Sequence, residues 1–300
     1  MEYLNLNNEN IVIPSCKGKS LRGGSGDGPH IRILEGVTAT NPRDDTAAVD
    51  VHLPAGTLTA AQLQTLADLA HTHAGGVLHL TPHAHLRLHG DPAPLTTAVT
   101  DAGFTVGHPA LPHLLASPLT GRIGGLRDIR PLTDTAQTRL LTARPGVTLG
   151  LDDGTGDVVA LTPDRTLLAL PGDEWALILG GEDTGIRRSD PVDAVGLLFD
   201  DTAPTDIAPT DTPIAVPTPP DPPIGWLDQP DGTVTLAGGL PGGVLPARLA
   251  EFLAAVEHPL VVTPWRSVLL CDLPEQVAEQ AVRVLAPMGL IFDAQSPHLR

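Results

Sequence analysis

A block of sequence occurs twice in this 300-residue chain. Residues 53–104 contain a Leu-Pro turn, a helix-like stretch, the strand-like segment VLHLTPHAHLRLHG and a second helix-like stretch, and residues 240–292 repeat this order around PLVVTPWRSVLLCDL. The paired Leu-Pro steps are 187 positions apart and the paired Thr-Pro steps 182 apart, so one loop is five residues shorter in the second copy. Two copies predict a pseudo-twofold body with a ligand groove between its halves.

Composition limits the class of protein. The hydrophobic content of 41% is enough to bury a core. The net charge of −17 disfavours nucleic acids and anionic membranes as partners. No apolar run approaches the roughly 20 residues that cross a bilayer, and no export signal is recognisable. Two cysteines cannot supply a disulfide framework or a four-cysteine metal or iron-sulfur site. We therefore expect a cytoplasmic protein without nucleic-acid or membrane partners.

The chain divides by composition. Its start holds both lysines and four of the five asparagines, which is typical of a foreign or disordered segment, and a later stretch holds eight prolines, which predicts a stiff linker. Between them, short apolar runs around Asp-Gly pairs predict strands joined by hairpin turns. The predicted parts are a foreign segment 1–28, a first half-domain 29–107, a middle α+β domain 108–202, a linker 203–223 and a second half-domain 224–300.

One segment carries an unusual polar face. Read as a single strand, residues 77–89 alternate, with leucines on one face and polar side chains on the other. The polar positions are His79, Thr81, His83, His85, Arg87 and His89. An ordinary solvated sheet face, a metal site and an anion site with Arg87 as a bidentate donor all remain open, although no carboxylate or cysteine is placed to complete a metal set.

Other candidate residues lie outside this strand. The Gly- and Pro-rich segment 105–135 contains Arg122 and Arg127, which either bind ligand carboxylates or pair with surface acids. The Asp152-Asp153-Gly154 step is interpreted as a hairpin turn in preference to a catalytic carboxylate set. Cys271, on an apolar strand pattern, is interpreted as an inert core thiol.

Several segments resemble known families. LTPHAHLRLHG resembles the strand motif of the nitrite and sulfite reductase ferredoxin-like half-domain, and LLASPLTGRIGGLRDIRPL, LDDGTGDVVAL and VVTPWRSVLLCDL are similar to successive segments of precorrin-3B synthase. The resemblance covers about residues 45–300. It implies an α+β fold with two ferredoxin-like half-domains flanking a nitrite/sulfite reductase-type α+β domain. It also implies oxygen-dependent hydroxylation and lactone formation on precorrin-3A in aerobic cobalamin biosynthesis, with a four-iron four-sulfur cluster.

The chain departs from that family pattern at the ligand face. His83 and His85 stand where the family has Arg and Asn, while Arg87 and His89 replace Gln and a second Arg. Pro112-His113 stands where the family tends to carry Arg-Asn. The family's cluster cysteines lie downstream of a segment like SPHLR, so the resemblance implies a chain truncated C-terminally before them.

We therefore predict that a precorrin, a macrocycle fringed with carboxylates, is the substrate of a precorrin-3B synthase-like oxidoreductase. The predicted substrate-binding residues are His83, His85, Arg87, His89, Arg122, Arg127 and Arg266. Neither catalytic residues nor a metal site are predicted, and the electron donor is not identified. The first alternative is a non-catalytic tetrapyrrole- or polycarboxylate-binding protein. A nitrite or sulfite reductase with siroheme is the less favoured alternative.

Overall fold

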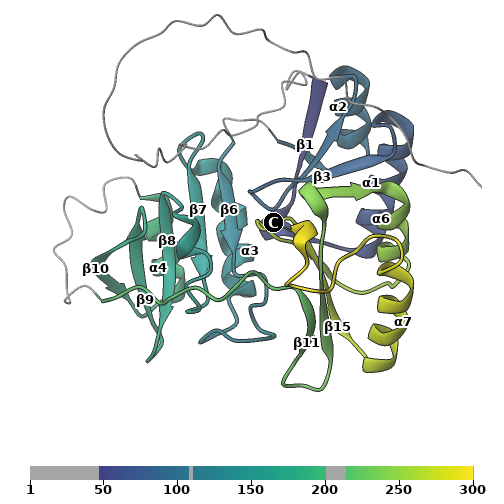
Figure 1. Cartoon of the computed structure of the whole chain (residues 1–300). Helices are drawn as coiled ribbons and strands as arrows, with labels where there is room; N and C mark the ends of the chain where they lie inside the picture. The colour runs from purple at the N-terminus through teal and green to yellow at the C-terminus, as the bar shows by residue number, and fades with distance from the viewer. Residues whose placement is uncertain (1–46, 108–110, 201–213, 300) are drawn as a thin grey trace, which may run out of the picture. The chain divides into compact units, whose positions relative to one another are not determined.

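The computed structural model describes residues 47–107, 111–200 and 214–299. The predicted foreign segment 1–28 and much of the predicted linker lie outside these residues. The described part contains helices together with three five-stranded sheets, which confirms the predicted α+β class (Figure 1). Two of the sheets come from the repeated halves, and the third belongs to the middle of the chain.

The two halves use the same order of elements. The first consists of β1 (Ala48–His52), β2 (Thr57–Leu58), α1 (Ala60–His73), β3 (Val77–Leu80), β4 (Leu86–His89), α2 (Pro92–Asp101) and β5 (Thr105–Val106). The second consists of β11 (Gly225–Asp228), β12 (Val234–Gly239), β13 (Val244–Pro246), α6 (Ala247–Ala254), β14 (Leu260–Val262), β15 (Ser267–Leu273) and α7 (Glu275–Leu285).

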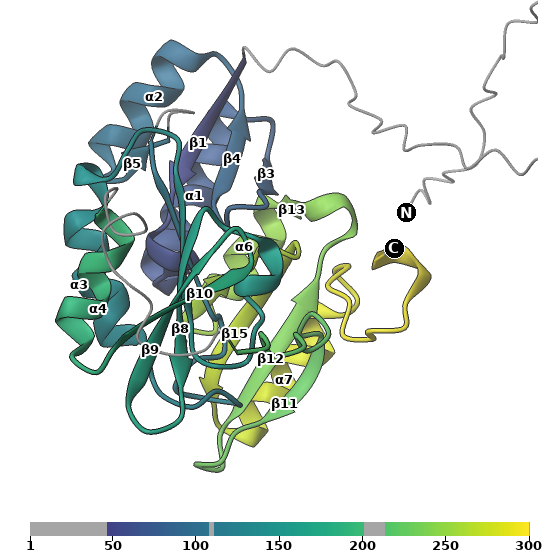
Figure 2. The same ribbon diagram turned by 90° about the vertical axis from the view of Figure 1, so that its left-hand side faces the viewer.

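Each half lends one short strand to the other. The first sheet has the order β13-β3-β4-β1-β5, and the second has the order β11-β12-β15-β14-β2. Strand β13 pairs antiparallel with β3, and β2 pairs antiparallel with β14. The helices of both halves lie together on the same side of these sheets (Figures 1 and 2). The pseudo-twofold symmetry indicated by the repeat is therefore accompanied by a reciprocal strand exchange.

Matching turns confirm the repeat at the level of hydrogen bonds. Residues 77–89 form a hairpin of β3 and β4, not the single strand that the alternation indicated, because a tight turn at Thr81 reverses the chain. The Thr81 amide donates to the His85 carbonyl at 3.0 Å, and in the second copy the Thr263 amide donates to the Ser267 carbonyl at 2.9 Å. The residue before each acceptor is left-handed, with φ of 58° at Ala84 and 59° at Arg266.

The helices pack as their sequences predict. In α1 the predicted capping box forms, because the Thr59 hydroxyl accepts from the Gln62 amide while the Gln62 side chain accepts from the Thr59 amide. The predicted apolar stripe of α1 is buried, and it belongs to one hydrophobic core that also contains leucines of β3, β4, α6 and β15. His71 on α1 bonds to Glu251 on α6 at 2.9 Å. The two halves therefore share a single core.

Two glycines make the exchange sterically feasible. Gly56 and Gly243 close the paired Leu-Pro turns with φ of 73° and 71°. A Cβ on Gly56 would overlap the carbonyl oxygen of Val262 at the end of β14, and a Cβ on Gly243 would lie 3.1 Å from the carbonyl oxygen of Leu80 at the end of β3. Each turn thus passes directly against the strand end of the opposite half. Glycine is favoured there because it tolerates a positive φ and has no Cβ that would approach the neighbouring carbonyl oxygen.

The middle of the chain forms the third sheet, of order β10-β9-β8-β7-β6. Its elements are β6 (His113–Ala116), α3 (Arg130–Arg139), β7 (Thr148–Asp152), β8 (Arg165–Leu170), β9 (Glu174–Leu179), β10 (Glu182–Arg188) and α4 (Pro191–Phe199). Helices α3 and α4 pack on one face of this sheet (Figure 1). Strands β6, β7 and β8 are parallel, which explains why β8 is buried along its whole length.

The predicted Asp-Gly hairpin is wrong. A two-residue turn connects antiparallel strands, whereas β7 and β8 are parallel and need a longer connection. The loop after β7 instead folds around the buried carboxylate of Asp152. This carboxylate accepts four backbone N–H groups, those of Gly154, Gly156, Val158 and Val159, at 2.9–3.0 Å.

Among the described residues, no helix has both the length and the apolar character needed to cross a bilayer.

Candidate functional site

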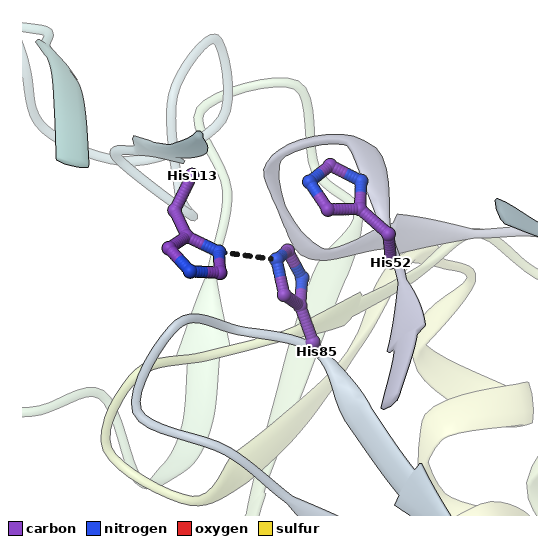
Figure 3. A group of neighbouring side chains, drawn as sticks. All are labelled: His52, His85 and His113. Carbon is purple, nitrogen blue, oxygen red and sulfur yellow. Dashed lines mark hydrogen bonds between the residues drawn. The ribbon is translucent and has the colours of Figure 1, made fainter. Parts of the chain in front are cut away.

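Four histidines gather where the first half meets the third sheet. His52 comes from the end of β1, His83 and His85 from the turn between β3 and β4, and His113 from the start of β6. The rings of His83 and His113 stack with centroids 4.0 Å apart, and those of His52 and His85 lie 4.2 Å apart. Figure 3 shows the rings of His52, His85 and His113 converging from three separate segments of the chain. We call these four residues the histidine cluster.

Hydrogen bonds define the state of the most buried ring. His85 is 2% exposed, and its Nδ1 atom accepts the Leu53 amide at 3.3 Å. The proton of the neutral ring therefore lies on Nε2, which donates to Nδ1 of His113 at 3.2 Å (Figure 3). The His52 ring bonds to the backbone carbonyl of Pro112. A network of neutral imidazoles thus joins two sheets.

The cluster disfavours positive charge on its own rings. Burial, followed by the neighbouring histidines, lowers the pKa of His85 to about 2, and the same causes lower that of His113 to about 4. Burial also lowers the pKa of His52 and of His83. All four rings are therefore neutral at pH 7, so as donors to an anion they offer N–H groups and no charge.

The predicted arginine of this face is already paired. Arg87 donates through Nε and Nη2 to both oxygens of Asp50 on β1, at 2.6 and 2.9 Å. Further along the face, His79 and His89 meet edge to face with centroids 4.8 Å apart. His83, His85, Arg87 and His89 do lie on one face, as the sequence predicts, but this face also carries Asp50.

The other predicted arginines are distributed over three places. Arg122 donates through two nitrogens to both oxygens of Asp272 on β15, each at 2.8 Å. Arg127 donates to the Leu170 carbonyl at 2.6 Å and lies over the Trp175 ring, 4.8 Å from its centroid. The Arg266 guanidinium makes no hydrogen bond or ion pair with the part of the chain that the structure describes, although its backbone bonds to Leu240 and Thr263. The arginines do not gather into one carboxylate-binding set.

Two cavities adjoin these arginines. A cavity of about 650 Å³ lies between the start of α1, the segment 116–134 and the strand β14, with Arg122 and Arg130 on its wall and a mainly apolar lining. A second cavity of about 600 Å³ is lined by Trp265, Arg266 and His298 beside the turn of the second half. Both volumes lie within the roughly 300–1,000 Å³ that is usual for small-molecule sites.

A buried acidic group lies behind β7. Asp152, Asp153 and Asp157 bring carboxylate oxygens within 4.8 Å of one another, as the histidine cluster does with three ring nitrogens. These two groups are the places in the described residues whose ligand atoms are close enough to share a cation. Burial and the neighbouring Asp152 carboxylate raise the pKa of Asp157 to about 7, while the Ser117 hydroxyl donates to it at 2.6 Å. Protonation of Asp157 therefore relieves the repulsion in this group.

The residues of this chain do not fit a four-iron four-sulfur cluster. Such a cluster is held by four thiolates. Cys271 is fully buried in a hydrophobic cluster with Ala237, Val261 and Leu269, and burial raises the pKa of its thiol to about 11. The other cysteine, Cys16, lies outside the described residues. Cys271 is the inert core thiol that its pattern predicts.

Substituting Arg122 with leucine is expected to destabilise the protein by about 2 kcal/mol. The Arg122 side chain is 9% exposed, and its removal leaves the Asp272 carboxylate, which is 36% exposed, without its bidentate partner. The matched control is Arg130→Leu. Arg130 pairs with Asp128 in the same loop, but both side chains are about half exposed, so the loss should stay below about 1 kcal/mol. Urea unfolding of both variants measures the difference, and equal losses would contradict a structural role for the Arg122 pair.

Two members of the histidine cluster were not among the predicted site residues. The sequence did hold a signal for His52, since the β1 alternation that buries Val49 and Val51 sets Asp50 and His52 on the opposite face. His113 occupies the position at which the family pattern differs from this chain. Their proximity to His85 depends on the packing of the third sheet against the first, which no local pattern encodes.

Comparison with known proteins gives two positive results. Residues 41–101 match the family model described as the nitrite/sulfite reductase ferredoxin-like half domain. The NirA protein of Mycobacterium tuberculosis has a similar structure, with a TM-score of 0.68, 15% sequence identity and 82% of this chain covered. At this identity the similarity concerns the fold alone. The chain spans 57% of the length of NirA.

No curated protein sequence matches the chain significantly. The family match lies in the first half of the chain, whereas the structural similarity extends over most of it. The chain therefore has a fold similar to that of NirA, and its first half contains a match to the nitrite/sulfite reductase ferredoxin-like half domain.

Proposed function

We propose that this chain is a cytoplasmic oxidoreductase of the precorrin-3B synthase type, acting on precorrin-3A by oxygen-dependent hydroxylation and lactone formation. The superfamily fold supports an oxidoreductase, and the ordered series of segments described above supports this reaction. Hydroxylation by oxygen requires a cofactor, because side chains alone do not activate oxygen. The chain's own contribution is therefore to bind and orient the macrocycle.

The observation that carries the proposal is the cavity beside the second turn. It offers the flat indole of Trp265, the guanidinium of Arg266 and the ring of His298 around about 600 Å³. Because Arg266 is exposed and its guanidinium has no partner among the described residues, its five N–H donors are available to a ligand. A conjugated ring bearing carboxylates matches an aromatic surface beside a free arginine.

Two other functions have specific support. The similarity to NirA favours a nitrite or sulfite reductase, whose siroheme is also a tetrapyrrole with carboxylates. The internal pairing of Arg87 and Arg122, together with the unsuitable Cys271, favours a binding protein without catalytic activity. All three functions share a carboxylated tetrapyrrole as the ligand.

One preparation separates them. The protein is purified anaerobically and analysed for iron, acid-labile sulfide and bound siroheme, and its turnover of precorrin-3A with oxygen is then assayed. Turnover supports the synthase, bound siroheme supports the reductase, and tight precorrin binding without either supports the binding protein. Failure to bind precorrin-3A, siroheme or uroporphyrin would refute a tetrapyrrole function altogether.

The variant Arg266→Gln tests the cavity itself. We expect it to weaken binding of uroporphyrin, an octacarboxylate tetrapyrrole, by about 10- to 150-fold, since a charge-assisted hydrogen bond is worth about 1.5–3 kcal/mol. Fluorescence quenching of the porphyrin measures the affinity. Arg283→Gln, on the exposed face of α7, controls for the loss of one positive charge. An effect of Arg130→Gln without an effect of Arg266→Gln would move the ligand to the apolar cavity.

A further inference from the structure

We infer that His52, His85 and His113 form a binding site for one divalent transition-metal ion, with zinc-like preferences. This site goes beyond the proposed function and does not depend on it. It lies where the first half meets the third sheet, and it is built from residues that replace other types in the family pattern or fall outside it.

The spacing of the nitrogens carries the inference. Zinc binds histidine nitrogen at roughly 2.0–2.1 Å in tetrahedral geometry, which puts two ligand nitrogens about 3.3 Å apart. Nε2 of His85 and Nδ1 of His113 are 3.2 Å apart. All three candidate nitrogens lie within 4.8 Å of one another, so the third has to move by no more than about 1.5 Å to complete the geometry. An ion would replace the proton that the His85 and His113 rings now share.

The surroundings of the rings support binding. Metal-ligating histidines usually donate their second ring N–H to a carbonyl or carboxylate, and His52 already bonds to the Pro112 carbonyl. The Asp50 carboxylate acts electrostatically on His113 and favours a cation there. Arg87 donates to both oxygens of this carboxylate, which fixes the position of Asp50 beside the cluster.

One contact has to change. In the metal-free structure, Nδ1 of His85 accepts the Leu53 amide. When a metal binds Nε2, the ring proton moves to Nδ1, which can then no longer accept this hydrogen bond. That hydrogen bond is long at 3.3 Å and therefore weak compared with a metal–nitrogen bond. We accordingly expect the Leu53 amide to lose this partner on metal binding.

The donor set selects the class of ion. Three imidazoles without a carboxylate suit zinc, cobalt, nickel or copper, whereas magnesium, calcium and manganese prefer oxygen ligands. Three protein ligands leave one tetrahedral position open for water or a substrate, as in catalytic zinc sites. His83 stacks on the His113 ring, with the centroids 4.0 Å apart. The acidic group is the weaker competitor, because Asp152 already accepts four backbone N–H groups.

Cobalt titration tests the site with a direct spectroscopic readout. Tag-free full-length protein is stripped with a chelator, titrated with Co²⁺ and followed by visible d–d absorption, and Zn²⁺ binding is measured by calorimetry. We expect one equivalent of Co²⁺ in a tetrahedral spectrum that Zn²⁺ displaces. His113→Gln and His52→Gln should each weaken binding by roughly 100-fold or more, since even supporting residues of metal sites contribute 10- to 100-fold.

Two controls keep the test decisive. His79→Gln and His89→Gln alter the histidine pair elsewhere on the same sheet face and should leave Co²⁺ affinity within about twofold. His113 is only half-buried, so its variant still reports if a His85 variant fails to fold. The inference is overturned if stripped wild-type protein takes up no Co²⁺ or Zn²⁺, or if the His52 and His113 variants bind as tightly as the wild type. The Co²⁺ titration does not depend on tetrapyrrole binding. A failure of the metal-site inference is therefore distinguishable from a failure of the proposed function.

Discussion

Replacing Gly56 with alanine is expected to lower the free energy of unfolding by more than about 4 kcal/mol, one of the rare large effects of a single methyl group. The φ of 73° at Gly56 already strains any other residue, at about 1–2 kcal/mol. In addition, the new Cβ would overlap the Val262 carbonyl oxygen, which is backbone at the end of β14 and cannot turn aside as a side chain would. The clash falls where β2 crosses to the second half.

Two alanine variants separate strain from overlap. Gly243→Ala has nearly the same φ, 71°, but its Cβ would lie 3.1 Å from the nearest backbone atom, so a loss of about 1–2 kcal/mol is expected. Gly75→Ala has a φ of 61° with no atom within 4 Å and reports strain alone. Urea unfolding monitored by circular dichroism gives all three values. If Gly56→Ala loses no more than Gly75→Ala, the close crossing of the two halves is wrong.

Asp157→Asn is expected to stabilise the protein at pH 8 by about 3 kcal/mol and to have little effect near pH 4. Burial raises the folded-state pKa of Asp157 to about 7, whereas an unfolded aspartate titrates near 3.9. Between these values the folded chain holds one proton more than the unfolded chain, so raising the pH lowers the free energy of unfolding. Asparagine cannot ionise, and its oxygen can still accept the Ser117 hydroxyl.

The measurement is the difference between variant and wild type, taken by urea unfolding from pH 4 to pH 8. Other groups titrate in both proteins and cancel in this difference. Asp173→Asn, whose side chain is 98% exposed, controls for the loss of one negative charge. A difference that stays constant with pH would mean that the pKa of Asp157 is not raised in the folded protein.

Local patterns explain how much of the fold the sequence could predict. The repeat was readable because paired Leu-Pro and Thr-Pro steps mark matching turns in both halves, and the α1 stripe was readable from its helical spacing. The hairpin at Thr81 was not readable from alternation, because the inward and outward positions of β4 continue the parity of β3 through the turn. The Asp-Gly step looks like a hairpin turn, yet its conformation serves the Asp152 carboxylate.

The site was less accessible to the same reasoning. The polar face was predicted, but the partners of its arginine and histidines come from other elements, as with Asp50 for Arg87 and His113 for His85. Arg122 and Asp272 are 150 residues apart in sequence, so neither local charge nor spacing identifies the pair. Whether the seven predicted residues contact a substrate stays a prediction.

The exchange of β2 and β13 also has a consequence for folding during synthesis of the chain. When the first half leaves the ribosome, the outer edge of β3 has no neighbour, because β13 is encoded roughly 160 residues later. At about 5–20 residues per second this delay lasts roughly 8–30 s, during which an open strand edge is available to any nascent chain nearby. Until β13 is synthesised, pairing of this edge with another chain therefore competes with folding. Neither half can complete its own sheet without the other.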